Sequence, residues 1–213
     1  MNLNQVERLQ WIALTVLGLV AGLALALPLG VPIFAVLGAM AGTPIVLGIV
    51  GLSLGTAQWP IIRRHMSSSW WWIIASTLGM AVGLTLGITL VEQIGRAIVG
   101  GPLTFRMLGV PERAASFGTI GLLGGAALGL AQWLVLRRQA TRCSRWISIN
   151  ALSLGAGLAS GSLLADALML RSGSLASTAI LLMIGSGFAG VCTAKTLTSV
   201  FTPRTGQVSA DAR

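Results

Sequence analysis

The sequence of 213 residues contains no tyrosine, one histidine, two cysteines and only five acidic residues. Metal sites and acid–base catalysis draw on these residue types, so the chain has little material for either. Charged residues make up 9% of the chain, whereas a soluble domain has about a quarter. The composition therefore excludes an ordinary soluble domain, and we expect no catalytic residues, no metal site and no enzymatic activity.

The two cysteines lie far apart, and neither belongs to a CxxC or Cys/His pattern. Cys143 falls in a basic segment and Cys192 lies within an apolar run, so they predict no disulfide framework. We expect both thiols to be reduced, with Cys192 acting as a small packing residue.

Hydrophobic residues make up 54% of the chain and gather in six long runs. The runs cover about 11–29, 35–62, 70–91, 114–136, 146–170 and 175–200. A helix needs about 20 apolar residues to cross a bilayer, and these runs are too long for barrel strands. The sequence therefore predicts an all-α polytopic membrane protein with six transmembrane helices. We expect one transmembrane domain over 1–201 and a disordered cytoplasmic tail over 202–213.

The first run is short enough for the apolar core of a signal peptide, and Ala24-Leu25-Ala26 would pass as a cleavage signal. We expect this run to be retained as a span, because it matches a repeat found twice more downstream. Inside the second run, Pro44 removes a helical hydrogen bond and predicts a kink.

An internal repeat is the strongest pattern in the chain. The segment GLSLGTAQWPIIRR, which begins at Gly51, recurs as GAALGLAQWLVLRR from Gly125. The same alignment continues without a gap, and apolar bias alone does not explain matched Gln, Trp, Arg and acidic positions. The matched pairs are Gln58 with Gln132, Trp59 with Trp133, Arg63 with Arg137, Arg64 with Arg138, Trp72 with Trp146, and Glu92 with Asp166.

A weaker third copy begins at Trp11, and near the end of the chain Thr193 replaces the glutamine of the other copies. The chain is therefore predicted to form three helical hairpins, over about 11–62, 70–138 and 146–200. Because each copy contains two spans, all copies keep one orientation, unlike the inverted repeats of many secondary transporters. Glycines at four-residue spacing recur in nearly every span and predict close helix packing.

The basic residues gather at one side of the predicted membrane. With six spans, ten of the fourteen Lys and Arg residues fall on the side of the two termini. The positive-inside rule then places both termini in the cytoplasm. A net charge of +9 would suggest nucleic acid in a soluble protein, but here the basic residues flank apolar spans. We expect no nucleic-acid partner and expect lipid headgroups to contact Arg63, Arg64, Arg137 and Arg138.

All seven tryptophans lie near the ends of spans on this same side. The simplest interpretation is a belt of indole rings at the headgroup level, with nearby polar residues hydrogen-bonding between helices. The alternative is a shallow polar cup or stacking platform, open to the cytoplasm, for a lipid, a quinone or a pigment. No other cofactor is predicted. The residues that would line this site are Gln58, Trp59, Trp72, Ser76, Gln132, Trp133, Trp146, Asn150 and Thr193.

Glu92 and Asp166 occupy equivalent positions, about 30 Å along a helix from the tryptophans. This depth places them at the opposite interface, where Arg96 and Arg171 follow them, so we expect solvated or partly paired acids. Ion coupling is the alternative, because acids inside a membrane are commonly functional. His65 follows two arginines and is expected to be solvated.

The motif GLAQWLVLRR ends at Arg138 and precedes a helix that begins at Trp146. The pattern GxxQWxxLRR followed by tryptophan resembles repeats in uncharacterised polytopic membrane proteins of bacteria, which are frequent in cyanobacteria. The resemblance covers nearly the whole chain, although Thr193-Ala194 replaces the Gln-Trp pair in the last helix. It implies a bacterial inner or thylakoid membrane and makes a photosynthetic or respiratory complex a candidate partner.

Three functions follow as alternatives. The first is a non-catalytic accessory subunit or assembly factor that packs against other membrane protein subunits and lipids. The second is a small-solute transporter, or the membrane-embedded substrate-binding component of one. The third is a lipid-, quinone- or pigment-binding protein that uses the tryptophan layer.

Overall fold

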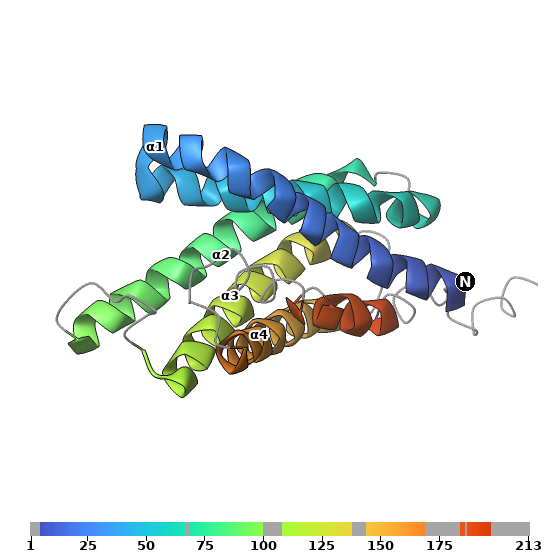
Figure 1. Cartoon of the computed structure of the whole chain (residues 1–213). Helices are drawn as coiled ribbons and strands as arrows, with labels where there is room; N and C mark the ends of the chain where they lie inside the picture. The colour runs from blue at the N-terminus through green and yellow to red at the C-terminus, as the bar shows by residue number, and fades with distance from the viewer. Residues whose placement is uncertain are drawn as a thin grey trace, which may run out of the picture.

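The computed structural model describes residues 5–66, 69–99, 108–137, 144–168, 184–185 and 187–196. Its labelled helices are α1 (Gln5–His65), α2 (Trp70–Val99), α3 (Val110–Leu136) and α4 (Ser144–Ala167), and residues 184–185 and 187–196 are also helical. Each labelled helix packs against the next one in the sequence, and α1 crosses the others (Figure 1). The all-α prediction is confirmed for the described residues, whereas the predicted tail over 202–213 lies outside them.

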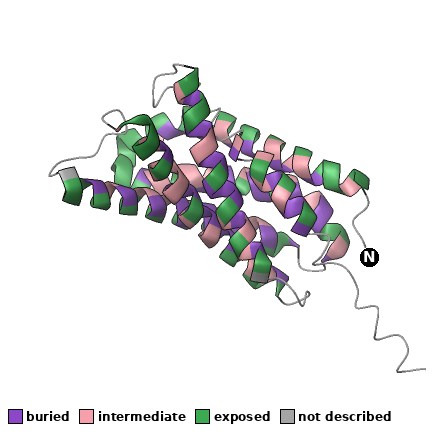
Figure 2. Ribbon diagram, turned by 90° about the horizontal axis from the view of Figure 1, so that it is seen from below, coloured by how far each residue is buried: buried purple, intermediate pink, exposed green. Residues whose placement is uncertain are grey.

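All four labelled helices are long and apolar enough to cross a membrane, with mean hydropathies of 2.4, 1.9, 1.7 and 1.4 in their spans. Exposed residues lie along the outer faces of the helices (Figure 2), and many of them are large and hydrophobic. On α2 they recur at every fourth residue, at Ile74, Leu78, Val82, Leu86, Leu90, Ile94 and Ile98. Exposed apolar surface of this extent is typical of a lipid or protein contact, so the architecture is compatible with insertion into a membrane.

The helix α1 turns back on itself at Gly38. This residue has φ 70° and ψ 174°, which are not helical dihedrals. The two arms, 5–37 and 39–65, run side by side (Figure 1). A β-carbon added at Gly22 would lie only 2.8 Å from Cα of Val50 on the other arm. Close backbone contact between the arms therefore depends on glycine.

The position of this turn corrects the sequence analysis, which left 30–34 between the first two spans. Pro28, Pro32 and Pro44 all lie inside α1, and the non-helical dihedrals occur at Gly38 instead. Proline keeps a helical φ and loses one hydrogen bond, whereas this reversal uses a positive φ that glycine adopts at little cost. The turn therefore forms at the glycine, and the first arm is longer than predicted.

Glycines also bring the arms and helices of different repeats into contact at equivalent positions. In each case the glycine faces the isoleucine that directly follows one of the aligned tryptophans Trp11, Trp72 and Trp146. An added β-carbon would lie 2.9 Å from Cα of Ile73 at Gly55, 2.9 Å from Cα of Ile147 at Gly129, and 3.4 Å from Cα of Ile12 at Gly190. The last contact joins residues 187–196 to α1, so the helices close into a ring around a common interior.

The buried residues lie on the inner faces of the helices (Figure 2), and the hydrophobic ones among them form two clusters. The first lies where the arginine-bearing ends of α1 and α3 meet the starts of α2 and α4, and consists of Trp11, Ile61, Ile62, Met66, Trp72, Leu136, Trp146 and Ala194. The second lies further along the helices and includes Leu19, Leu54, Met80, Leu128 and Leu154. The polar residues of the candidate site lie between the two clusters.

Candidate functional site

Three tryptophans from α1, α2 and α4 meet in the interior. The ring centroids are 6.1 Å apart for Trp11 and Trp72, 6.3 Å for Trp11 and Trp146, and 5.9 Å for Trp72 and Trp146. All three pairs are edge-to-face, with interplanar angles of 67°, 70° and 66°, an arrangement that aromatic rings favour. Each residue is at most 1% exposed. The expected headgroup belt is therefore wrong for these three tryptophans, which pack against one another instead.

Each indole of this triad donates a hydrogen bond to a neighbouring repeat. Trp72 Nε1 donates to Oε1 of Gln58 at 3.1 Å, and Trp146 Nε1 donates to Oε1 of Gln132 at 3.0 Å. Trp11 Nε1 donates to Oγ1 of Thr193 at 2.9 Å. The third bond joins residues near opposite ends of the chain and closes the ring.

The two glutamines each connect a pair of helical segments. Each glutamine accepts from tryptophan through its Oε1. In addition, Gln58 Nε2 donates to Oγ1 of Thr15 and Gln132 Nε2 donates to Oγ of Ser76, both at 3.0 Å. A side-chain amide can do this because it carries both an acceptor and donors. Trp11, which was not among the candidate site residues, is thus a full member of the network together with Thr15. The repeat alignment of Trp11 with Trp72 was the signal that could have included it.

The predicted polar positions are brought together, but they are buried. The network comprises Thr15, Gln58, Ser76, Gln132, Asn150 and Thr193, each at most 5% exposed. The tryptophan triad covers them on the side of the arginine-bearing helix ends. This geometry favours the interpretation as hydrogen bonds between helices over a polar cup that opens to the cytoplasm.

The network predicts a clear loss of stability when the glutamines are removed. We expect Gln58→Ala with Gln132→Ala to lower the unfolding free energy by about 2–4 kcal/mol, because two buried indole N–H groups lose their acceptors. Thermal unfolding in detergent, with and without added lipids or quinones, measures this loss. Gln93→Ala on the exposed face of α2 is the control. If the double variant were as stable as the control, the structural role of the two glutamines would be contradicted. It would also be contradicted if an added ligand stabilised the native protein but not the double variant.

The remaining tryptophans lie at the periphery. Arg63 stacks its guanidinium 4.7 Å from the ring centroid of Trp59, and Arg137 lies 5.3 Å from that of Trp133. These are equivalent positions of the repeat, and a cation over an indole face is favourable. Arg64 is exposed, whereas Arg138 lies outside the described residues. The three described arginines are thus all exposed at this end of the molecule.

Trp70 and Trp71 form a second aromatic pair at the start of α2. Their ring centroids are 4.1 Å apart with an interplanar angle of 29°, and the residues are 52% and 43% exposed. Nearby, Trp59 Nε1 donates to Oγ of Ser69 at 2.9 Å. The belt interpretation fits this outer set of tryptophans, which present indole surface to the surroundings.

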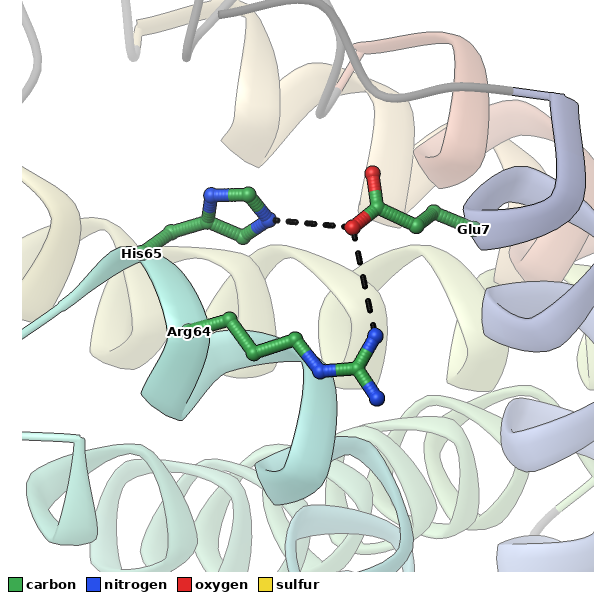
Figure 3. Close-up of polar contacts among 3 residues, drawn as sticks. All are labelled: Glu7, Arg64 and His65. Carbon is green, nitrogen blue, oxygen red and sulfur yellow. Dashed lines mark ion pairs between the residues drawn. The ribbon is translucent and has the colours of Figure 1, made fainter.

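The two ends of α1 meet through Glu7 (Figure 3). Its Oε1 lies 4.0 Å from Nη1 of Arg64 and 3.8 Å from Nε2 of His65, so one carboxylate oxygen faces both basic groups. The His65 side chain is only 6% exposed, which contradicts the expectation of a solvated histidine. Because the arms are antiparallel, their ends are brought together and the histidine turns inward toward the acid.

At the other end of the molecule, the two equivalent acids differ. Asp166 Oδ1 lies 3.0 Å from Nη1 of Arg113 on α3, and the side chains are only 14% and 15% exposed. Glu92 lies 4.0 Å from Arg96, and both side chains are about half exposed. Arg171, the partner that the sequence suggested for Asp166, lies outside the described residues. No local spacing pointed to Arg113, because the contact joins two different helices.

This contrast predicts unequal effects of neutralising the two acids. We expect Asp166→Asn to lower the unfolding free energy by about 1–2 kcal/mol, because a largely buried arginine loses its charged partner. Glu92→Gln should change it by less than about 1 kcal/mol, since exposed ion pairs contribute little. Denaturant titration of both variants in the same detergent measures the difference. Equal losses would show that burial of the Asp166 pair has no energetic consequence.

The described residues contain no group of three or more His, Cys, Asp and Glu that would hold a metal ion. Comparison with protein-family models, with curated proteins and with solved structures finds no match to this chain.

Proposed function

We propose that the chain is a non-catalytic integral membrane protein that acts as an accessory subunit or assembly factor of a larger membrane complex. The carrying observation is the closed ring of Trp11, Trp72 and Trp146, hydrogen-bonded to Gln58, Gln132 and Thr193. It fills the axis on which a solute would travel. The polar side chains of the interior hydrogen-bond the helices to one another. The apolar outer faces are available for lipid and protein contacts.

In this proposal each arm of α1 crosses the bilayer, and six spans form three hairpins around the tryptophan triad. An arm of 33 residues would be about 50 Å long, which is ample for a hydrocarbon core of about 30 Å. The arginine-bearing ends then lie in the cytoplasm with both termini. Arg63 and Arg137, stacked on Trp59 and Trp133, are positioned to bind anionic lipid headgroups.

Cysteine accessibility tests this topology. In a background with Cys143→Ser and Cys192→Ser, Arg64→Cys and Arg137→Cys should react with an impermeant maleimide from the cytoplasmic side. Glu112→Cys, at the opposite end of α3, should react from the other side. Labelling of positions 64 and 137 from different compartments would overturn the three-hairpin arrangement.

Purification tests the function itself. The tagged full-length protein, extracted from its native host with a gentle detergent, should bring with it a defined membrane protein complex, identified by mass spectrometry. The absorbance spectrum of the same sample reports a bound pigment or quinone, which would favour a binding function instead. Solute uptake by proteoliposomes that contain only this protein would overturn the proposal in favour of a transporter.

A further inference from the structure

The tryptophan and polar network has threefold regularity except at one position. Gln58 and Gln132 each accept from the indole of the following helix and donate to a hydroxyl in the preceding helical segment. Thr193 accepts from Trp11, but its own hydroxyl donates to the backbone oxygen of Ala189. In the third repeat, the Thr193 hydroxyl thus supplies the acceptor that glutamine supplies in the other two. It has no amide nitrogen, so nothing corresponds to the bond that a glutamine would donate to Asn150.

A small cavity lies at this irregular position. It has a volume of about 20 Å³, and its walls include Trp11, Trp146, Asn150, Thr193 and both glutamines, with leucines below. A site needs about 10–15 Å³ and two to four polar partners to hold a water molecule. The cavity therefore has the size for one water, and the polar groups that face it occupy a small part of mostly apolar walls.

The unused hydrogen-bonding capacity of the walls matches a water molecule. The Asn150 side chain donates from Nδ2 to the backbone oxygen of Trp146 at 2.9 Å, so its carbonyl oxygen is the group left to accept. Gln58 and Gln132 each use one of two amide hydrogens within the network. The hydroxyl oxygen of Thr193 has a second lone pair. The residues that line the cavity thus carry both spare donors and spare acceptors, and water is the smallest ligand that satisfies both.

We infer that the cavity is a specific binding site for a single water molecule, which takes the place of the missing glutamine amide. The water donates to Oδ1 of Asn150 and to Oγ1 of Thr193, and it accepts from an amide hydrogen of a neighbouring glutamine. It completes the third side of the ring, so that all three repeats are linked by equivalent chains of hydrogen bonds around the tryptophan triad.

Water–protein cross-relaxation in the nuclear magnetic resonance spectrum of the full-length protein in nanodiscs tests this site. Trp146 lines the cavity, whereas Trp72 does not, although both are buried and both donate to a glutamine. The expected result is a water cross peak at the indole N–H of Trp146 and none at that of Trp72. No cross peak at Trp146, or equal peaks at both indoles, would overturn the inference.

The variant Thr193→Gln provides the second arm of the test. A glutamine there should accept from Trp11, donate to Asn150 and displace the water, so the Trp146 cross peak should be lost and the unfolding temperature should rise. The matched control is Thr56→Gln, at an exposed position of α1, which should leave the cross peak unchanged. A Thr193→Gln protein that folds and keeps the cross peak would contradict the assignment, and the wild-type comparison of Trp146 with Trp72 decides it if this variant does not fold.

Discussion

Replacing Trp72 by alanine should lower the unfolding free energy by about 3–5 kcal/mol, the range for truncating a large buried aromatic side chain. Trp72 contacts both other rings of the triad, at centroid distances of 6.1 and 5.9 Å. It also donates to Gln58, whose carbonyl oxygen would be left buried without this partner. The same substitution therefore removes packing, ring contacts and a hydrogen bond together.

The matched control lies two residues away. Trp70→Ala removes an indole that is 52% exposed and stacked on Trp71, so we expect a loss of no more than about 1 kcal/mol. Unfolding by titration with a denaturing detergent in mixed micelles measures both variants on one scale. Equal losses would show that the triad is not the centre of the packing.

The second large effect is expected at Gly51. A β-carbon there would lie 2.5 Å from the backbone oxygen of Ser76 and 2.9 Å from Cα of Thr77. Because the obstructing atoms belong to the backbone of α2, no side chain can rotate away to make room. We expect Gly51→Val to cost about 3 kcal/mol or more by forcing the helices apart, and the unfolding titration used for the tryptophans measures it.

Gly48 is the control for this substitution, one turn earlier on the same arm of α1. Its added β-carbon would meet only side-chain atoms, at 3.7 and 3.8 Å, which is ordinary contact. Gly48→Ala should therefore be neutral or stabilising by up to about 1 kcal/mol, since alanine favours the helix. If Gly51→Val were as stable as Gly48→Ala, the close approach of α1 and α2 would be disproved.

The repeat in the sequence predicted which polar residues would lie together. Aligned Gln58 and Gln132 perform the same task, and the replacement at Thr193 marks the one place where the network differs. An alignment carries this information because equivalent residues of a repeat take equivalent environments. The glycines that are spaced four residues apart along the helices are likewise found at helix contacts, as their spacing predicted.

Burial could not be predicted in the same way. Trp71 and Trp72 are neighbours with the same local composition, yet Trp71 is half exposed and Trp72 is buried. Consecutive residues of a helix point about 100° apart, so the packing of the other repeats decides which indole faces inward. The ion pair of Asp166 with Arg113 likewise depends on the register between α3 and α4, which no local pattern specifies.

The reversal at Gly38 bears on how the protein enters its membrane. From Leu9 to Ile62 the sequence contains no charged residue, and one glycine makes the turn between the arms. In the proposed topology this tip must be translocated during biogenesis, and charges are the costly groups to move through hydrocarbon. The first hairpin can thus insert as a preformed pair of arms without carrying any ionised group across, and it offers the later repeats a surface on which to assemble.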